Sequence, residues 1–406
     1  MKITQNQSKA FKKLIENKVG ALFMKMGSGK TRVAVMLGNS VPDVDLFIWI
    51  APYRIINPID DGISSIKDEV AKWGGLNAQT IFVGIESIQA SDRIYIELRA
   101  QIEKAKKPFI FVDESIKIKN IDAKRTRRLL ELSELAEYKV ILNGTPFTKN
   151  LMDIYPQMQF LSPKILKMTY SQFKDTFVRY MTVTKRIGSY KEIKKEYITG
   201  YENIDFLYRV IGDFIFECDL TLNVKQIYNV VNYKISDDDR KIYNQLKEKY
   251  LDNELLQLKN NNIFLEMTQK MQHSYCITEN KFKELDNLFE TIPENKSIIF
   301  CKYIASKEAC KKRYPNAIVL SYSMDSYGHN LPEFNHMIFF DKDWDWARRN
   351  QAKARNARIT SKEDLSYYDF TGDVGLEDMI DKNIRKKTGM IEYFKNISNE
   401  ELKKLL

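Results

Sequence analysis

Residues 21–38 have the sequence ALFMKMGSGKTRVAVMLG, in which an apolar run, a glycine-containing loop and a second apolar stretch follow one another. The first run predicts a buried strand, and the second stretch favours a helix. Glycines between a strand and a helix let backbone N–H groups close around phosphate oxygens, beside the positive end of the helix dipole. Lys30 would then reach the β- and γ-phosphates, and Thr31 would hold Mg²⁺. The predicted phosphate-binding loop comprises Met26, Gly27, Ser28, Gly29, Lys30 and Thr31.

The usual form of this loop has one more glycine, at the position of Met24 in this chain. A plain glycine turn is therefore the alternative. The strand before the loop and the helix after it favour the phosphate-binding interpretation.

Further short apolar runs, bounded by Gly and Pro, alternate with helical stretches on both sides of a basic, aromatic middle region. Such runs predict buried parallel strands and a doubly wound α/β sheet. In the first half they are LFIWIAP, TIFVG, PFIFVDE and KVILNGTP; in the second half they are SIIFC, AIVLSY, HMIFFD and LSYYDF. We expect a first lobe at residues 1–163, a helical insert and crossover at 164–230, and a second lobe at 231–406.

The composition is that of a soluble globular chain, with 406 residues, 44% hydrophobic and 29% charged. No apolar run approaches the length of a membrane span, and the first residues have no apolar stretch typical of a secretory signal. Four scattered cysteines and three histidines indicate neither a zinc site nor a disulfide framework, so we expect a cytoplasmic protein. The formal charge of +10 suggests a polyanionic partner.

Residues 109–114, FIFVDE, place two carboxylates at the end of an apolar run. At the carboxyl end of a buried strand beside the glycine loop, Asp113 would bind Mg²⁺ through water, and Glu114 would polarise the attacking water. A solvated strand end is the alternative. Two other residues are weaker candidates: Thr145 fits a turn that could sense the γ-phosphate, and the amide of Gln7 could bind adenine, although an exposed Gln is the commoner case.

Residues 351–359, QAKARNARI, place Gln351, Arg355 and Arg358 at helical spacing, so we expect them on one face of a helix. The interpretation from this stretch alone is a solvated basic face.

In chain order the sequence contains QSKA, MGSGKT, IAPYRIINP, DESIKIKN, NGTPFTKN, IIFCKY, SYGHNL and QAKARNARI. This series resembles the motifs of helicase superfamily two, and specifically those of Swi/Snf-type translocases on double-stranded DNA. DESIKIKN is similar to the family's acidic box followed by Arg-Ile-Lys-Asn. DWDWARRNQAKAR is similar to its Trp-Asn-Pro run that leads into Gln-Ala-x-x-Arg-x-x-Arg. The compact size is similar to that of small phage or prophage members.

The resemblance implies two RecA-like lobes, the cofactors ATP and Mg²⁺, and a DNA partner. It implies that Arg355 and Arg358 act as arginine fingers on the γ-phosphate, with Gln351 ordering their helix. The implied contacts to DNA phosphates are sequence-independent and salt-sensitive. Candidates for these contacts are Arg54, Lys117, Lys119, Thr145, Lys149 and Asn330, together with the basic stretches 124–130 and 185–195.

Some positions depart from the family pattern. Ile116 stands where a histidine is usual, and Asn143 where a threonine is usual; both positions help to signal bound ATP to the DNA side. The second lobe is shorter than usual between IIFCKY and SYGHNL.

We expect a monomeric ATP-dependent motor that translocates on or remodels duplex or forked DNA, with replication or recombination proteins as possible partners. A strand-separating helicase and a slow-ATPase DNA loading factor are the alternatives; the sequence shows no obvious wedge hairpin.

Overall fold

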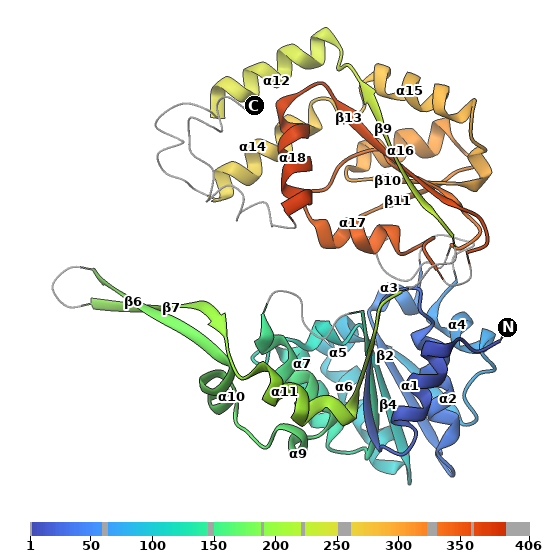
Figure 1. Cartoon of the computed structure of the whole chain (residues 1–406), viewed down its shortest axis with the longest axis vertical. Coiled ribbons are helices and arrows are strands. Elements are labelled where there is room, and N and C mark those ends of the chain that lie inside the picture. The colour runs from blue at the N-terminus through green and yellow to red at the C-terminus, as the bar shows by residue number, and fades with distance from the viewer. Residues whose placement is uncertain are drawn as a thin grey trace. The chain divides into compact units, whose positions relative to one another are not determined.

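The computed structural model describes residues 2–58, 64–144, 150–187, 191–220, 224–250, 261–322, 331–358 and 361–386. The chain divides into two compact units, Met1–Thr221 and Leu222–Leu406, and each unit contains its own parallel sheet (Figure 1). None of the described helices has both the length and the apolar sequence that crossing a membrane requires.

The sheet of unit 1 has the strand order β3-β2-β4-β5-β1-β8, and all its strands are parallel. Every residue of β1, β2 and β4 is buried, as their unbroken apolar runs predict. The strands are β1 (Val19–Met24), β2 (Leu46–Ala51), β3 (Gln79–Gly84), β4 (Pro108–Asp113), β5 (Tyr138–Asn143) and β8 (Ile215–Cys218). The prediction of a doubly wound α/β lobe is confirmed, and β8 adds a strand that the sequence analysis missed.

Helices cover the sheet of unit 1 (Figure 1). Gly38 of α2 lies against Phe47 and Phe111, and a Cβ at this glycine would come within 2.9 Å of the Phe111 ring. Glycine therefore lets the helix that follows the glycine loop pack closely on the sheet. The helices are α1 (Gln5–Leu14), α2 (Lys30–Ser40), α3 (Tyr53–Ile56), α4 (Ile66–Lys72), α5 (Ile85–Ala90), α6 (Asp92–Lys104), α7 (Lys124–Ser133), α8 (Ile154–Leu161), α9 (Pro163–Leu166), α10 (Tyr170–Phe177) and α11 (Ile204–Ile211), with short 3₁₀ turns η1 (Ser115–Ile118), η2 (Leu151–Asp153) and η3 (Gly212–Phe214).

Residues 164–230, predicted as a helical insert, are only partly helical. Between α10 and α11 the chain forms an antiparallel hairpin of β6 (Val178–Ile187) and β7 (Lys191–Tyr201), which projects away from the sheet of unit 1 (Figure 1). The sequence of β6, VRYMTVTKRI, is rich in β-branched and aromatic residues, which explains why a strand forms there. The helical prediction is therefore wrong for this segment.

The sheet of unit 2 has the strand order β11-β10-β12-β13-β9, again entirely parallel. Its strands are β9 (Gln226–Tyr233), β10 (Ser297–Cys301), β11 (Ile318–Ser321), β12 (His336–Phe339) and β13 (Leu365–Gly372). The predicted boundary at residue 231 falls inside β9, whose eight residues all pair with β13. The second doubly wound lobe is confirmed.

Residues on alternate sides of β10 and β12 enter two separate cores. Ile299 and Ile338 belong to one core, and Phe300 and Phe339 to the other. The Oγ of Ser236 accepts the N–H of Asp239 at 3.1 Å and so caps the start of α12. The helices are α12 (Asp237–Tyr250), α14 (Asn261–His273), α15 (Glu279–Phe289), α16 (Ile304–Arg313), α17 (Trp346–Lys353) and α18 (Gly375–Lys386), with the 3₁₀ turn η4 (Glu294–Lys296).

Candidate active site

The glycine loop joins β1 to α2 at the carboxyl edge of the sheet of unit 1. Gly27 and Gly29 have φ angles of 82° and 83°, in the left-handed region that residues with a Cβ rarely adopt. Gly29 is the N-cap residue of α2 and has no side chain that could accept the N–H groups of the first helical turn. The N-terminal N–H groups and dipole of α2 are thus placed as a phosphate site requires.

Lys30 and Thr31 are the first two residues of α2 and are half-buried. The Nζ of Lys30 donates to the carbonyl of Met24, the last residue of β1, at 3.0 Å. The ammonium group therefore lies over the loop that it follows. Met26 is half-buried and Ser28 is buried in the same loop.

Asp113 ends β4 and Glu114 follows it, and both side chains are buried. Glu114 has φ 52° and ψ 50°, a left-handed conformation that is unfavourable for a non-glycine residue, and its N–H donates to Oδ1 of Asp113 at 2.9 Å. Burial raises the pKa of Asp113 to about 7; the charge of Glu114 adds to the increase and that of Lys30 opposes it. The Asp113 carboxyl group therefore interacts electrostatically with both Glu114 and Lys30.

The segment after the acids is tied to the rest of unit 1. The Oγ of Ser115 donates to Oε1 of Gln157 on α8 at 2.7 Å, and the Gln157 amide donates to the carbonyl of Asp153 at 2.8 Å. Ser115 and Gln157 are completely buried. This contact could not be predicted from the sequence, because a Ser and a Gln separated by 42 positions give no joint signal.

Gln7 lies inside unit 1 rather than on its surface. Its Oε1 accepts the N–H of Thr4 at 3.1 Å, which completes a capping box at the start of α1, and its Nε2 donates to the carbonyl of Ser28 at 3.0 Å. The amide therefore links α1 to the glycine loop. Contact with adenine stays a prediction.

Some of the predicted DNA-binding residues share one edge of unit 1. Arg54 lies on α3 directly after β2 and is half-buried. Glu86 on α5 accepts the N–H of Tyr53 at 2.8 Å and lies 3.9 Å from the Nζ of Lys117 on η1. The same carboxylate therefore joins the segments of Arg54 and Lys117. Lys119 lies 3.9 Å from Asp153.

Three other candidates, Thr145, Lys149 and Asn330, lie outside the described residues.

Two basic side chains of α7 contact α6. Lys124 and Arg128 both form ion pairs with Asp92, and the Arg128 guanidinium lies 4.8 Å from the centre of the Tyr95 ring. These two residues therefore contribute to helix packing within unit 1, and a role in DNA binding is not needed to explain them.

In unit 2, α17 ends at Lys353, before either arginine of the QAKARNARI stretch. The N–H of Arg355 donates to the carbonyl of Ala352 at 3.0 Å, a bond three residues apart rather than four. The Ser361 hydroxyl binds the carbonyl of Asn356 and accepts the N–H of Arg358. The prediction that Gln351, Arg355 and Arg358 share one helical face is therefore wrong.

The arginine segment is nevertheless packed in place. Ala352 and Ala357 are buried in the core beside β10, β12 and β13. Arg355 is only 1% exposed, and its carbonyl accepts the N–H of Leu331 at 3.0 Å. Arg358 is half-buried. This arrangement does not fit a uniformly solvated basic face.

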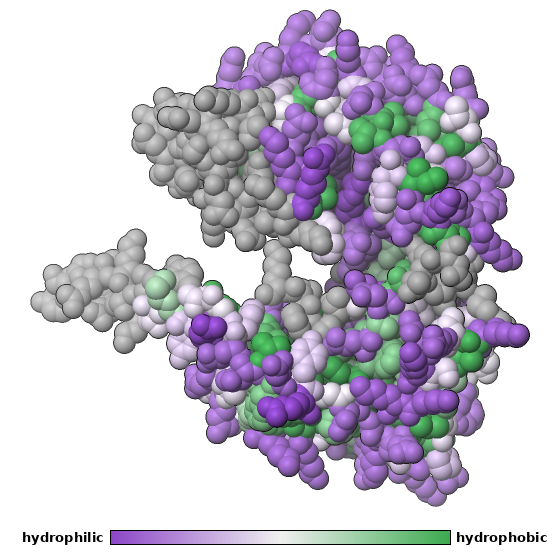
Figure 2. Space-filling view, viewed as in Figure 1, coloured by the Kyte–Doolittle hydropathy of each residue, from purple (hydrophilic) through white to green (hydrophobic). Residues whose placement is uncertain are grey.

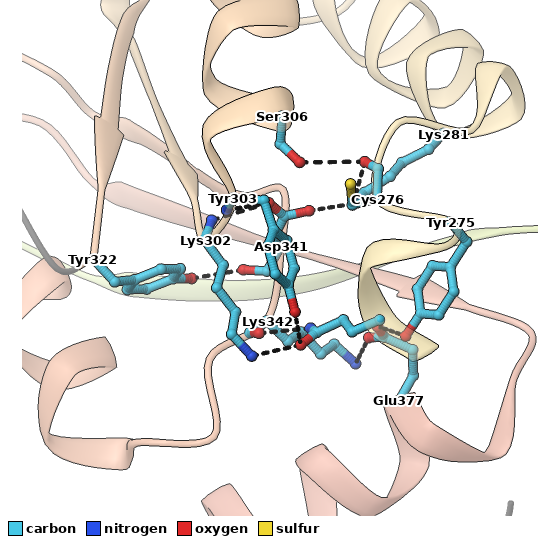
Figure 3. A network of polar contacts seen from close by, with 11 residues as sticks. Tyr275, Cys276, Lys281, Lys302, Tyr303, Ser306, Tyr322, Asp341, Lys342 and Glu377 are labelled. Atoms are coloured by element: carbon cyan, nitrogen blue, oxygen red, sulfur yellow. Dashed lines mark hydrogen bonds and ion pairs between the residues drawn. The ribbon is translucent and has the colours of Figure 1, made fainter. Parts of the chain in front are cut away.

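A network of buried charges precedes α17 (Figure 3). Asp341, just after β12, binds the Nζ of Lys281 at 2.7 Å and the backbone N–H of Lys302 at 2.9 Å. The next residue, Lys342, lies 2.7 Å from Asp381 and 3.5 Å from Glu377, and burial raises the pKa of Glu377. These contacts join the carboxyl ends of β10 and β12 to α15 and α18. The sequence analysis missed this network.

Comparisons with known proteins place the chain in a family. The SNF2-related domain matches residues 76–314. The chromatin-remodeling ATPase INO80 of Arabidopsis thaliana is 21% identical, with 64% of this chain and 19% of that protein covered. The ISWI chromatin-remodeling complex ATPase ISW1 of Saccharomyces cerevisiae is 22% identical, with 96% and 40% covered. An uncharacterized ATP-dependent helicase of Mycoplasma pneumoniae is 21% identical, with 97% and 42% covered.

A solved structure, the Sulfolobus solfataricus SWI2/SNF2 ATPase core in complex with dsDNA, is 17% identical with a TM-score of 0.43, and 99% of this chain and 94% of that chain are covered. The chain spans less than half the length of the curated relatives described above. Because the domain match extends over more than half of the 406 residues, the chain belongs to the SNF2-related family.

Proposed function

We propose that this protein is a DNA-dependent ATPase that hydrolyses ATP to ADP and phosphate and uses the energy to translocate on or remodel duplex or forked DNA. The observation that carries the proposal is that the glycine loop after β1 and the acid pair at the end of β4 lie at the same edge of one parallel sheet, with only β5 between the two strands. A phosphate-binding loop and a buried acid pair on one sheet edge are the parts that nucleoside triphosphate hydrolysis requires.

The groups of unit 1 fit ATP and Mg²⁺. The backbone of Gly27–Gly29 and the N-terminus of α2 would bind phosphate oxygens, and Lys30 would leave the carbonyl of Met24 to pair with them. Thr31 and Asp113 offer the oxygen ligands that Mg²⁺ prefers, and a cation there would lower the raised pKa of Asp113. When bound, Mg²⁺ would neutralise charge on the phosphate oxygens.

Glu114 is the residue we propose as the general base. Its left-handed backbone directs the side chain differently from that of Asp113, so the two neighbouring carboxylates can have separate tasks. Holding a residue in this conformation costs free energy, and such strain is typical of functional positions. Glu114 would orient and polarise the water that attacks the γ-phosphate.

Arg355 and Arg358 are proposed to stabilise negative charge on the transferred phosphoryl group. Arg358 is the stronger candidate, because Arg355 is almost completely buried within unit 2. The proposal of a DNA partner rests on the net charge of +10 and on relatives named as ATP-dependent helicases and chromatin-remodelling ATPases.

The test is the steady-state ATPase rate of the purified protein with no nucleic acid, single-stranded DNA, duplex DNA, forked DNA and RNA. We expect the highest rate with duplex or forked DNA, and a steep decline of this stimulation as salt increases. Equal rates in all five conditions, or stronger activation by RNA than by duplex DNA, would contradict the proposed substrate. Absence of hydrolysis in every condition would contradict the proposed activity.

A further inference from the structure

The β6–β7 hairpin is a two-stranded ribbon that only its base ties to unit 1. Ten residue pairs join the strands, from Val178 and Tyr201 at the base to Ile187 and Lys191. At the base, the N–H of Glu202 donates to the carbonyl of Phe177 at 3.0 Å, and Val178 is buried. An isolated two-stranded ribbon is at best marginally stable in water. A ribbon of this length is therefore expected to have a binding partner.

Apolar side chains are exposed on both faces where the ribbon leaves the unit. Tyr180 and Ile198 pair across the strands and are 40% and 45% exposed. Met181, whose side chain points to the opposite face, is 55% exposed. Figure 2 shows a pale, less hydrophilic region there, beside the purple surface of the unit. No sheet or helix within the described part of unit 1 covers these residues.

Charge indicates which partner the ribbon fits. The sequence between the Met181–Tyr197 pair, residues 182–196, has five Lys or Arg and two Glu, a net charge of 5 − 2 = +3. At the base, the side chain of Arg179 is 65% exposed and lies 3.5 Å from Glu202, and the Nζ of Lys174 lies 4.4 Å from the centre of the Tyr180 ring. Positive charge concentrated on a narrow, extended element favours a polyanion.

The dimensions of the ribbon agree with a nucleic acid duplex. Ten residue pairs at about 3.3 Å each extend over about 33 Å, and paired strands lie about 4.8 Å apart. The major groove of B-DNA is about 12 Å wide and admits a two-stranded ribbon. A bulge between Arg179 and Tyr180 increases the local twist, as following a helical groove requires.

We propose that the β6–β7 ribbon is a DNA-binding arm of unit 1 that lies along the duplex and neutralises backbone phosphates without reading sequence. This inference rests on the proposed function, because it names the element that holds the DNA. The arm adds affinity and salt dependence, and it takes no part in ATP hydrolysis itself.

The test uses the full chain with residues 182–196 replaced by Asn-Gly. This change joins Met181 and Tyr197, which pair in register, through a two-residue turn that suits a hairpin. Affinity for a 30-base-pair duplex should fall about tenfold or more. The slope of log affinity against log salt should become shallower by about one to three, at about 0.9 for each lost phosphate contact. The ATPase rate without DNA should be unchanged.

A second, full-length variant has the five Lys and Arg of residues 182–196 changed to Gln, and it keeps the ribbon. It should lose as much affinity for duplex DNA, and as much of the salt slope, as the shortened variant. Because this variant keeps the ribbon, an equal loss would show that misfolding of the shortened variant is not the cause. Wild-type affinity and slope in this variant would overturn the inference, whatever the shortened variant shows. If the wild-type protein fails to bind duplex DNA, the proposed function fails instead.

Discussion

Glu114 permits a test in which stability and activity should change in opposite directions. Its φ of 52° costs a residue with a Cβ about 1–2 kcal/mol, and glycine avoids this cost. Glycine also makes the unfolded chain more flexible, which removes about 0.5–1 kcal/mol of the gain. Glu114→Gly should therefore stabilise unit 1 by about 0.5–1 kcal/mol.

The same substitution removes the proposed general base, so DNA-stimulated ATP turnover should fall by about 10²-fold or more. Glu114→Gln should lose turnover equally while leaving the backbone strain, and thus stability, near wild type. Lys167 is the matched control, because it is exposed, has φ 52° and ends α9 outside the proposed site. Lys167→Gly should gain a similar stability and keep full activity.

The stability of unit 1 can be measured separately by amide hydrogen exchange in β4, since local opening free energies are resolved residue by residue. ATP turnover is measured with saturating duplex DNA. Slower exchange in both glycine variants, with turnover lost only at position 114, is the expected pattern. Wild-type turnover in Glu114→Gln would refute the assignment of the base, and faster exchange in Glu114→Gly would refute the strain argument.

Four other predictions concern single side chains. Lys30→Ala should abolish ATP binding and turnover, as measured by nucleotide titration and ATPase rate, because the loop then lacks its ammonium group. Arg358→Ala should cut turnover by about 10²-fold with ATP affinity nearly intact, whereas exposed Arg348→Ala should leave turnover unchanged; equal rates for the two would contradict the role of Arg358. Arg355→Ala should lower the melting temperature of unit 2 as well as turnover, because it also empties a buried site. Burial lowers the pKa of Lys139 to about 8 from an unfolded value near 10.5, so stability should rise with pH between these values, and Lys139→Met should remove this rise from urea titrations at pH 7–10.5. An identical pH dependence in Lys139→Met would show that another group is responsible.

Local signals in the sequence were sufficient for the sheets and the glycine loop. The buried strands are unbroken apolar runs, and each one forms its backbone hydrogen bonds with neighbouring strands that are also apolar. The apolar pattern therefore predicts the sheets correctly. The positive φ angles of Gly27 and Gly29 follow from their position between a strand and a helix. Asp113 and Glu114 could be found because strand ends in parallel sheets collect at one edge. The left-handed backbone conformation of Glu114 could not be predicted, since Glu is not a residue that indicates a left-handed turn.

The hairpin and the end of α17 show where local signals compete. Residues 178–201 combine charged residues typical of a helix surface with β-branched and aromatic residues that favour a strand. Pairing between β6 and β7 stabilises the strand rather than the helix. In QAKARNARI the alanines favour a helix, yet the chain leaves it after Lys353. Asn356 and Ser361 offer hydrogen bonds to the backbone that compete with helical ones. Both outcomes depend on contacts rather than on periodicity.

The buried charges of unit 2 depend still more on distant contacts, and they bear directly on the proposed mechanism. Asp341 and Lys342 follow β12 after one intervening residue, and in the sequence such a pair resembles a solvated loop. Their partners Lys281 and Asp381 are 60 and 39 positions away, so no local pattern could reveal the pairing. Breaking a fully buried ion pair such as Lys281–Asp341 typically costs about 3–5 kcal/mol, which exceeds the cost of removing an exposed charge. The network therefore fixes the chain just before α17, and a well-defined position for Arg358 requires such a fixed starting point.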